Sequence, residues 1–425
     1  MAGLSDMARS LQAKGREAGI PGSDPDPESR RDTDGEGPRR FAIWEIAEWM
    51  LPVSAEYLRR TLREVPTLPR GDAEGRGALR FTAGELSSIR AHFAATGSAE
   101  RYLPPPRERA VVVAMAAPLG AAGRSRAAAE LAVAAALDGW RVIAIDGSGR
   151  GDLARRIEAG PAQEGGRERG RNGGMRDLFA AAAGRALRAR NAALAERGER
   201  PAPMPADLAA AAESGRDLAR PSRWPGLSVI AGGAELAAAD LALAEWDRAV
   251  PGWSAVRALE EALAPLRQEA DLILIDPPRG LGLLATSVLA GADLLLAPVG
   301  RDPGEAGLGL AVLDAALERI EAGERDLAAA LGRPLPGPRR PEVRLLPLEE
   351  TPPGLTGALP PLPAPPPAPL DRGGTRTWFD VDPRETGRAA QIGPRSALAR
   401  LWRAVARDLA ATGGGVVGAA GPAEG

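Results

Sequence analysis

Long apolar runs alternate with helical patterns over most of the chain after residue 109. Continuous apolar runs are typical of strands that are buried on both faces of a parallel sheet. Such runs lie at 110–116, 141–146, 271–276 and 293–299, with shorter ones at 227–230 and 343–346. Segments rich in helix formers separate them, at 125–137, 253–266 and 281–289. This alternation predicts an α/β fold with a doubly wound, mostly parallel sheet.

A different pattern fills residues 39–103. A first helix is marked by apolar residues at the spacing of one helix face, namely Ile43, Ile46, Ala47 and Met50. Ser54 is a good N-cap for a second helix. Thr82 and Glu85 form a capping box that begins a third helix. The Gly/Arg-rich stretch 70–76 lies between the second and third helices and predicts a hairpin.

Arginine is concentrated at two places in this N-terminal unit. The outer face of the second helix carries Arg59, Arg60 and Arg63, and the hairpin carries Arg70, Arg76 and Arg80. Two short helices, a basic hairpin and a third helix resemble the winged helix-turn-helix of MerR-type DNA-binding domains. The resemblance implies that the helix set faces the major groove and the hairpin set contacts phosphates. The alternative is that both sets are ordinary solvated surface.

The composition excludes several kinds of chemistry. The chain has no cysteine and one histidine, His92, so disulfides, thiolate sites and multi-histidine metal sites are excluded. The only lysine is Lys14, and the basic charge is otherwise arginine. A net charge of −2 gives no general attraction to DNA, which must be bound by a local patch. With no bilayer-length apolar run and no secretory signal, we expect a cytoplasmic protein.

The remaining segments are assigned by composition. The α/β domain spans 110–350 and follows a hinge at 104–109. The other segments are a disordered arm (1–38), a low-complexity insert with one helix near 175–195 (161–206), a polyproline-like linker (351–370), a C-terminal segment and helix (371–412) and a disordered tail (413–425). The final helix carries one apolar face, made of Leu398, Leu401, Trp402, Val405 and Leu409.

A candidate phosphate-binding loop follows the first strand of the α/β domain. Such a loop needs small residues, a cation at the start of the helix and a hydroxyl for Mg²⁺. The candidate nucleotide-binding residues are Gly120, Gly123, Arg124, Ser125 and Arg126. Two other strands end in an acid, Asp146 and Asp276, which with Ser125 are the candidate Mg²⁺ ligands. The loop alone could be an ordinary Gly-rich turn, but the two acids favour a nucleotide site.

Three motifs in order resemble those of the ParA/RepA-type plasmid-partitioning ATPases. They are LGAAGRS (119–125), IDGSG (145–149) and IDPPRGLG (275–282), and the stretches 224–236 and 377–389 also look like the RepA branch. The resemblance implies a P-loop NTPase fold, binding of ATP and Mg²⁺, DNA binding, a homodimer, and a centromere-binding partner of the ParB/RepB type. It also implies association with the nucleoid or a plasmid. No membrane partner is expected.

Three positions depart from the family pattern. The signature lysine, which in the family reaches the partner's phosphates across an ATP-sandwich dimer, falls on Leu119. The P-loop lysine falls on Arg124, whose planar guanidinium is a poor substitute for an ammonium. The second acid of the family's IDxD motif, which helps to position the attacking water, falls on Ser148. These departures predict a partitioning protein with a degenerate ATPase site and no confident catalytic residue.

Two alternatives remain open at this point. An active, ATP-switched ATPase would hold MgATP through Arg124 and Ser125. A dinucleotide-binding regulator is suggested only by the Gly-rich run 147–151, which follows the second strand rather than the first. If the site is inactive, the sequence alone predicts that Arg124→Ala leaves the melting temperature unchanged.

Overall fold

The computed structural model describes residues 39–74, 78–157, 174–211, 215–332, 340–349, 355–371 and 375–412. The predicted arm (1–38) and tail (413–425) lie outside these residues, and so does Arg76.

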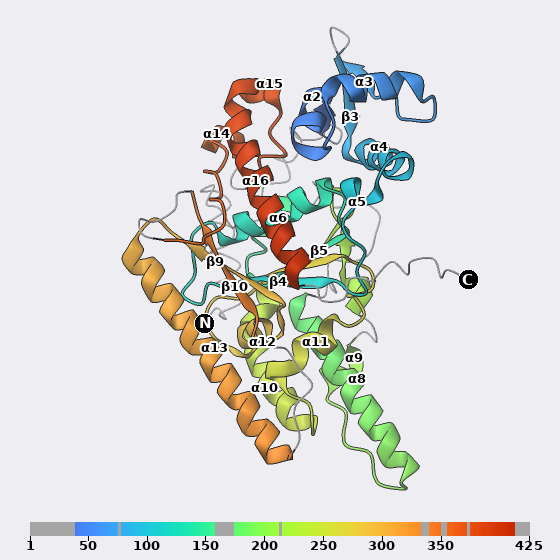
Figure 1. Ribbon diagram of the computed structural model, residues 1–425. Helices are drawn as coiled ribbons and strands as arrows, with labels where there is room; N and C mark the ends of the chain where they lie inside the picture. The colour runs from blue at the N-terminus through green and yellow to red at the C-terminus, as the bar shows by residue number, and fades with distance from the viewer. Residues whose placement is uncertain are drawn as a thin grey trace, which may run out of the picture.

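Seven strands of the described chain form one central sheet (Figure 1). They are β4 (Val111–Met115), β5 (Val142–Asp146), β6 (Arg220–Pro221), β7 (Leu227–Ile230), β8 (Leu272–Asp276), β9 (Leu294–Val299) and β10 (Glu342–Pro347). Their order across the sheet is β10-β9-β4-β8-β5-β7-β6, and every pair is parallel except β6 with β7. The predicted doubly wound, mostly parallel α/β fold is confirmed.

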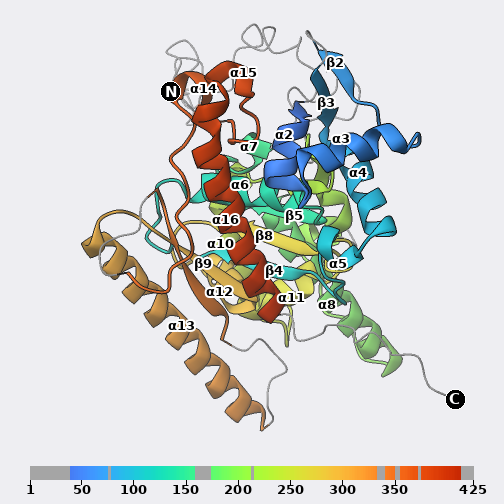
Figure 2. The same cartoon turned by 45° about the horizontal axis from the view of Figure 1, so that its top comes forward.

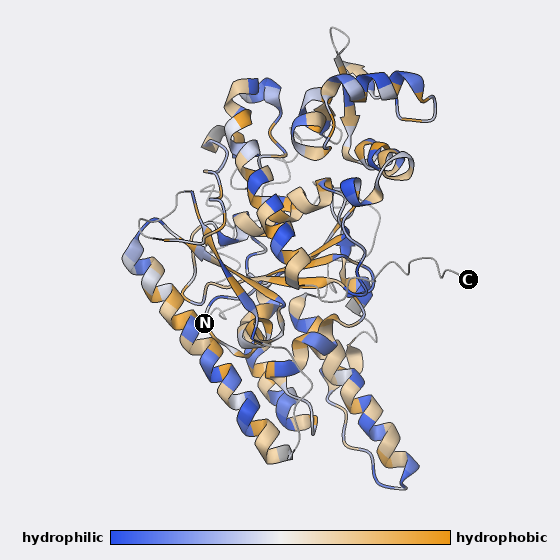
Figure 3. Ribbon diagram, in the orientation of Figure 1, coloured by the Kyte–Doolittle hydropathy of each residue, from blue (hydrophilic) through white to orange (hydrophobic). Residues whose placement is uncertain are grey.

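Helices cover both faces of the sheet. On one side lie α6 (Arg124–Leu137), α7 (Ala154–Ile157) and α16 (Arg388–Thr412); on the other lie α8 (Met175–Glu196), α10 (Ala239–Ala249), α11 (Ala258–Leu263) and α12 (Leu283–Gly291). Smaller elements and the edge helix are α9 (Ala206–Ala210), η3 (Gly215–Leu218), η4 (Ala234–Ala238), η5 (Ala255–Arg257), α13 (Pro303–Leu331), α14 (Ala368–Asp371) and α15 (Pro383–Thr386). Alternate strand residues serve the two cores, with Val111 and Val113 on one side and Val112 and Ala114 on the other. The apolar strands therefore occupy the centre of the molecule (Figure 3).

The N-terminal unit has its own three-stranded antiparallel sheet, in the order β1-β3-β2. Its elements are β1 (Arg40–Ala42), α2 (Ile43–Glu45), the π-helix η2 (Ile46–Met50), α3 (Ala55–Glu64), β2 (Asp72–Glu74), β3 (Ala78–Thr82), α4 (Ala83–Thr96) and α5 (Ala99–Tyr102). The Ser54 hydroxyl accepts from the Tyr57 N–H at 3.1 Å. Thr82 and Glu85 cap each other, at 3.1 and 2.7 Å. Both caps predicted from the sequence are confirmed.

The N-terminal unit is packed against α6 and α16 instead of lying apart from them (Figure 2). The buried guanidinium of Arg90, in α4, donates to the carbonyls of Met50 (2.5 Å), Tyr102 (3.0 Å) and Leu137 (2.6 Å), the last of which belongs to α6. The segment 104–109 is also tied down, since Arg107 donates to the Leu409 carbonyl of α16 at 2.7 Å. The expected hinge is therefore held against the body.

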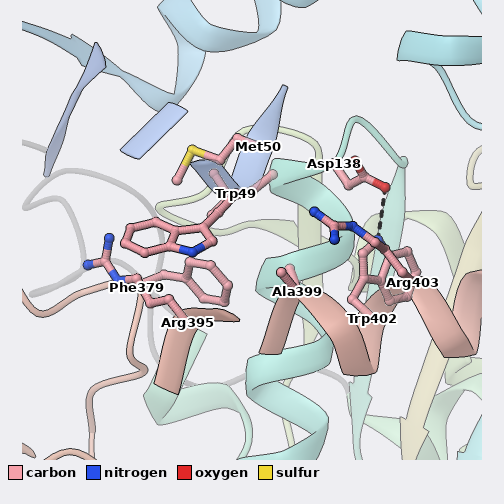
Figure 4. A pocket seen from close by; sticks show the side chains of 10 residues that line it. Trp49, Met50, Asp138, Phe379, Arg395, Ala399, Trp402 and Arg403 are labelled. Atoms are coloured by element: carbon pink, nitrogen blue, oxygen red, sulfur yellow. Dashed lines mark hydrogen bonds between the residues drawn. The ribbon is translucent and has the colours of Figure 1, made fainter. Parts of the chain in front are cut away.

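A small pocket marks the junction between this unit, α6 and α16 (Figure 4). Trp49 comes from the N-terminal unit, and its indole N–H donates to the Ser396 hydroxyl at 3.2 Å. Trp402 donates to the Asp138 carboxylate at 2.9 Å, which joins α16 to the end of α6. Aromatic side chains thus line a pocket between three segments that are distant in the sequence.

Two low-complexity assignments are corrected by packing. The helix expected near 175–195 is α8, whose first half is buried in the core beneath the sheet through Leu178, Phe179 and Leu187. It is therefore part of the α/β body, whereas residues 158–173 lie outside the described residues.

Over 355–371 the proline-rich segment is not a free linker, and it ends in the short helix α14. The Leu362 N–H donates to the Pro347 carbonyl at 2.9 Å, and its carbonyl accepts from Glu349 at 2.8 Å. Leu359 and Leu362 are buried in the core. Proline lacks the N–H of a regular ladder, but the intervening leucines can pack and bond. The predicted apolar face of the final helix is also buried.

Candidate phosphate-binding site

The loop between β4 and α6 has the backbone of a tight anion-binding turn. Gly120 (φ 83°) and Gly123 (φ 88°) adopt left-handed conformations that favour glycine, and Gly123 is the N-cap of α6. The Gly280 N–H donates to the Pro118 carbonyl at 3.0 Å, so the loop after β8 is fixed beside this loop. The N-terminal N–H groups of a helix of 14 residues therefore lie at the carboxyl edge of the sheet.

The two predicted acids are direct neighbours at this edge. Strands β5 and β8 are adjacent, and Asp146 pairs with Asp276 in their register. Both carboxylates are fully buried. Burial raises the pKa of each of them above its usual range. The two acids that the sequence singled out thus lie side by side at this edge.

Asp146 is engaged by the backbone. One carboxylate oxygen accepts from the Ser148 N–H and the other from the Ala154 N–H, each at 2.8 Å. These bonds hold the loop after β5 and the start of α7, and they partly offset the effect of burial on the pKa of Asp146. A role as Mg²⁺ ligand stays a prediction for this residue, since each oxygen already has a partner.

Arg124 is directed at Asp276. Its Nε lies 2.5 Å from Oδ1 of Asp276, and its Nη2 donates to the Pro277 carbonyl at 2.6 Å. The guanidinium is buried, with 5% of the side chain exposed. Its charge lowers the pKa of Asp276 and so opposes the larger effect of burial. Arg124, which was predicted to contact phosphates, thus binds groups of the protein itself.

Arg126 is also engaged internally. It is buried and donates from Nη1 to the Pro363 carbonyl at 2.7 Å, which ties α6 to the proline-rich segment. Burial lowers its pKa, partly opposed by Glu130. Of the five predicted nucleotide-binding residues, Gly120 and Gly123 have the expected backbone, while Ser125 is half-buried beside them.

Sequence reasoning missed a second cation at this loop. The side chain of Arg279 lies beside Gly120, with Cδ 3.8 Å from the place where a Cβ of residue 120 would stand. Arg279 is exposed, and so is Leu119, with 57% of its surface accessible. The only signal in the sequence was its position just after the Asp-Pro-Pro motif, because contact across two loops leaves no periodic pattern.

The predicted DNA-binding arginines differ in their exposure to solvent. Arg59, Arg60 and Arg63 are all exposed along α3, as expected from its amphipathic pattern. Arg70 is exposed and donates to the Leu62 carbonyl at 3.2 Å. Arg80 is buried and donates to the Asp382 carboxylate at 3.0 Å, so its assignment to the exposed wing is wrong. Alternate strand residues face opposite sides, and this side of β3 packs on the C-terminal segment.

Part of the chain matches a known protein family. A family model described as an AAA domain (AAA_31) matches residues 110–327, just over half of the chain. The chain belongs to this family. Its mostly parallel sheet and the loop before α6 are those of a P-loop NTPase fold. No protein with curated annotation matches the chain in sequence.

Several solved structures are similar to this chain. One titled "Partition Protein" is similar over 91% of this chain and 96% of its own, with 14% identity and a TM-score of 0.54, and it supports the same fold. An ATP complex of an McdA variant from Cyanothece matches over 71% and 96%, with 13% identity and a TM-score of 0.43. The Pyrococcus furiosus cell division ATPase MinD matches over 70% and 98%, with 17% identity and a TM-score of 0.38.

The family implies ATP and Mg²⁺, but the residues at this loop fit the metal poorly. The space beside Asp276 holds a guanidinium, and each oxygen of Asp146 already accepts a backbone N–H. Within the described residues no group of three or more His, Cys, Asp or Glu could hold a metal ion.

None of the helices in the described part of the chain has the length and apolar character needed to cross a membrane.

Proposed function

We propose that this protein is a DNA-binding partition protein of the ParA/RepA type whose ATPase site no longer hydrolyses ATP. It acts as a homodimer with a centromere-binding partner of the ParB/RepB kind. The observation that carries this proposal is the exposed row of three guanidiniums on α3, presented by a unit that is locked onto a ParA-type body.

The N-terminal unit has the parts that a winged helix-turn-helix needs. Helix α3 follows η2 after a short turn, and the hairpin of β2 and β3 follows α3. Arg59, Arg60 and Arg63 lie on the side of α3 opposite its buried Leu58 and Leu62. A short helix with a cationic outer face can enter the major groove, while the neighbouring hairpin reaches the phosphate backbone. Arg70, and Arg76 by its place in the sequence, are the proposed backbone contacts.

Replacing Arg59, Arg60 and Arg63 together with alanine should weaken binding to duplex DNA by at least tenfold. With three cations fewer on the face that contacts DNA, fewer counterions are released on binding, so the dependence of affinity on salt should also flatten. Fluorescence anisotropy with a labelled duplex, measured over a series of salt concentrations on the full chain, gives both quantities.

A matched control removes the same charge elsewhere. Arg190, Arg197 and Arg200 are exposed on and after α8, which projects from the end of the molecule away from α3 (Figure 1). Their triple replacement with alanine should leave DNA affinity and its salt dependence near the wild-type values. Equal losses in both triple variants would mean that α3 has no special role in DNA binding.

ATP hydrolysis by the purified protein should stay at background. Phosphoryl transfer relies on positioned cations and a positioned water, and Leu119 and Ser148 stand where the family uses a lysine and an acid. Phosphate release should be measured alone, with DNA and with a ParB-like partner. Turnover that is stimulated by either addition and lost in Asp276→Ala would restore the alternative of an active, ATP-switched ATPase.

A further inference from the structure

Asp276 is a buried carboxylate that needs a cation beside it. Its side chain is fully buried, and what opposes the effect of burial on its pKa is mainly the charge of Arg124, with a smaller contribution from the Ser125 hydroxyl. Moving a carboxylate out of water without a counter-ion is strongly unfavourable, and burial accordingly raises its pKa. The folded protein therefore depends on whatever neutralises this group.

The guanidinium of Arg124 meets that need and is held at two points. Nε lies 2.5 Å from Oδ1 of Asp276, and Nη2 donates to the next carbonyl, that of Pro277, at 2.6 Å. Nη1 is buried and has no hydrogen-bond partner among the described residues. The planar, charged guanidinium is held at Asp276 and at the Pro277 carbonyl. It therefore occupies the space beside Oδ1 that a second cation would need.

We infer that Arg124 serves as a built-in counter-ion in the place of the divalent metal ion at Asp276. The ion pair joins the start of α6 to the end of β8 whether or not Mg²⁺ is present. This inference rests on the proposed loss of ATP hydrolysis and extends it, because it makes the fold at this edge independent of the metal.

The test is divalent-cation rescue, with thermal melting of the full chain in EDTA and in millimolar MgCl₂. Wild-type protein should melt at the same temperature in both. Arg124→Ala should melt several degrees lower in EDTA, because Asp276 loses its counter-ion, and Mg²⁺ should restore part of the loss by entering the vacated space. Arg190→Ala, the same change at an exposed position of α8, should show neither effect.

The double variant Arg124→Ala/Asp276→Asn separates charge from packing. With no buried charge left, it should melt higher than Arg124→Ala in EDTA and should not respond to Mg²⁺. If Arg124→Ala does not fold, folding of the double variant alone supports the same conclusion, and failure of both overturns it. A wild-type melting temperature that rises with Mg²⁺ as much as that of Arg124→Ala also overturns it. DNA binding through α3 does not enter this measurement, so failure of the proposed function would be seen separately.

Discussion

Replacing Glu45 by glutamine lowers the free energy of unfolding by about 3–5 kcal/mol, the usual cost of breaking a buried ion pair. Glu45, in α2, is fully buried between two guanidiniums, those of Arg39 (2.6 Å) and Arg395, which belongs to α16. Burial raises the pKa of Glu45, but the two arginines, with the Ala42 N–H, outweigh this effect and hold the pKa below its usual range. Glutamine has a similar shape and no charge, so the two cations would repel each other.

The loss of stability in Glu45→Gln should be greatest at the junction of the N-terminal unit with the body. Arg395 also donates to the carbonyls of Trp378 (3.1 Å) and Val381 (2.6 Å), so it ties three segments together. We expect Glu45→Gln to lower the melting temperature and to speed proteolysis at 104–109. Glu48→Gln, the same change at an exposed position one turn away, should do neither. Equal effects in both variants would show that the buried pair does not hold this junction.

Replacing Glu130 by glutamine should remove a loss of stability that the wild-type protein suffers as pH rises. Glu130 is fully buried in α6 and accepts from the Trp378 N–H at 3.0 Å. Burial raises its pKa to about 7, partly opposed by the Trp378 hydrogen bond and by Arg126. The folded state therefore holds this proton more tightly than the unfolded state, in which the pKa is near 4.5.

The direction in which stability changes with pH follows from this difference in the pKa of Glu130. Stability from this group is fully present below pH 4.5 and is lost as pH rises through 7, in total about 3 kcal/mol. The stability of Glu130→Gln relative to wild type should thus increase between pH 5 and pH 8, as measured by denaturant unfolding at several pH values. Glu318→Gln, at an exposed position of α13, is the control. A difference between Glu130→Gln and wild type that does not change with pH would contradict the expectation.

The secondary structure and the sheet could be predicted from the sequence because continuous apolar runs and helical apolar spacing both report local burial. The strands that end in Asp146 and Asp276 were predicted within one residue of β5 and β8. The caps at Ser54 and Thr82 were predicted because a side chain bonds a backbone group three residues away. Both depend on neighbours in the chain.

The segments that composition assigned least well were those that pack at a distance. The proline-rich segment was expected to be a linker, yet Leu359 and Leu362 are buried against the sheet edge. The hinge at 104–109 was expected to separate two domains, yet Arg90 and Arg395 bind the N-terminal unit to α6 and α16. A low-complexity composition predicts little regular structure, but it does not show whether the few leucines in the segment pack against the rest of the protein.

By itself the sequence determined the α/β class, the positions of the loop and the two acids, and the exposed arginines of α3. Each of these follows from residue type at a fixed spacing. Only the tertiary structure decided where the long cationic side chains go. Arg80, Arg124 and Arg126 were all expected to meet phosphates, and each is bonded inside the protein. A guanidinium on a flexible stem can reach partners in several directions, so its use depends on which carbonyls and carboxylates the fold brings within reach.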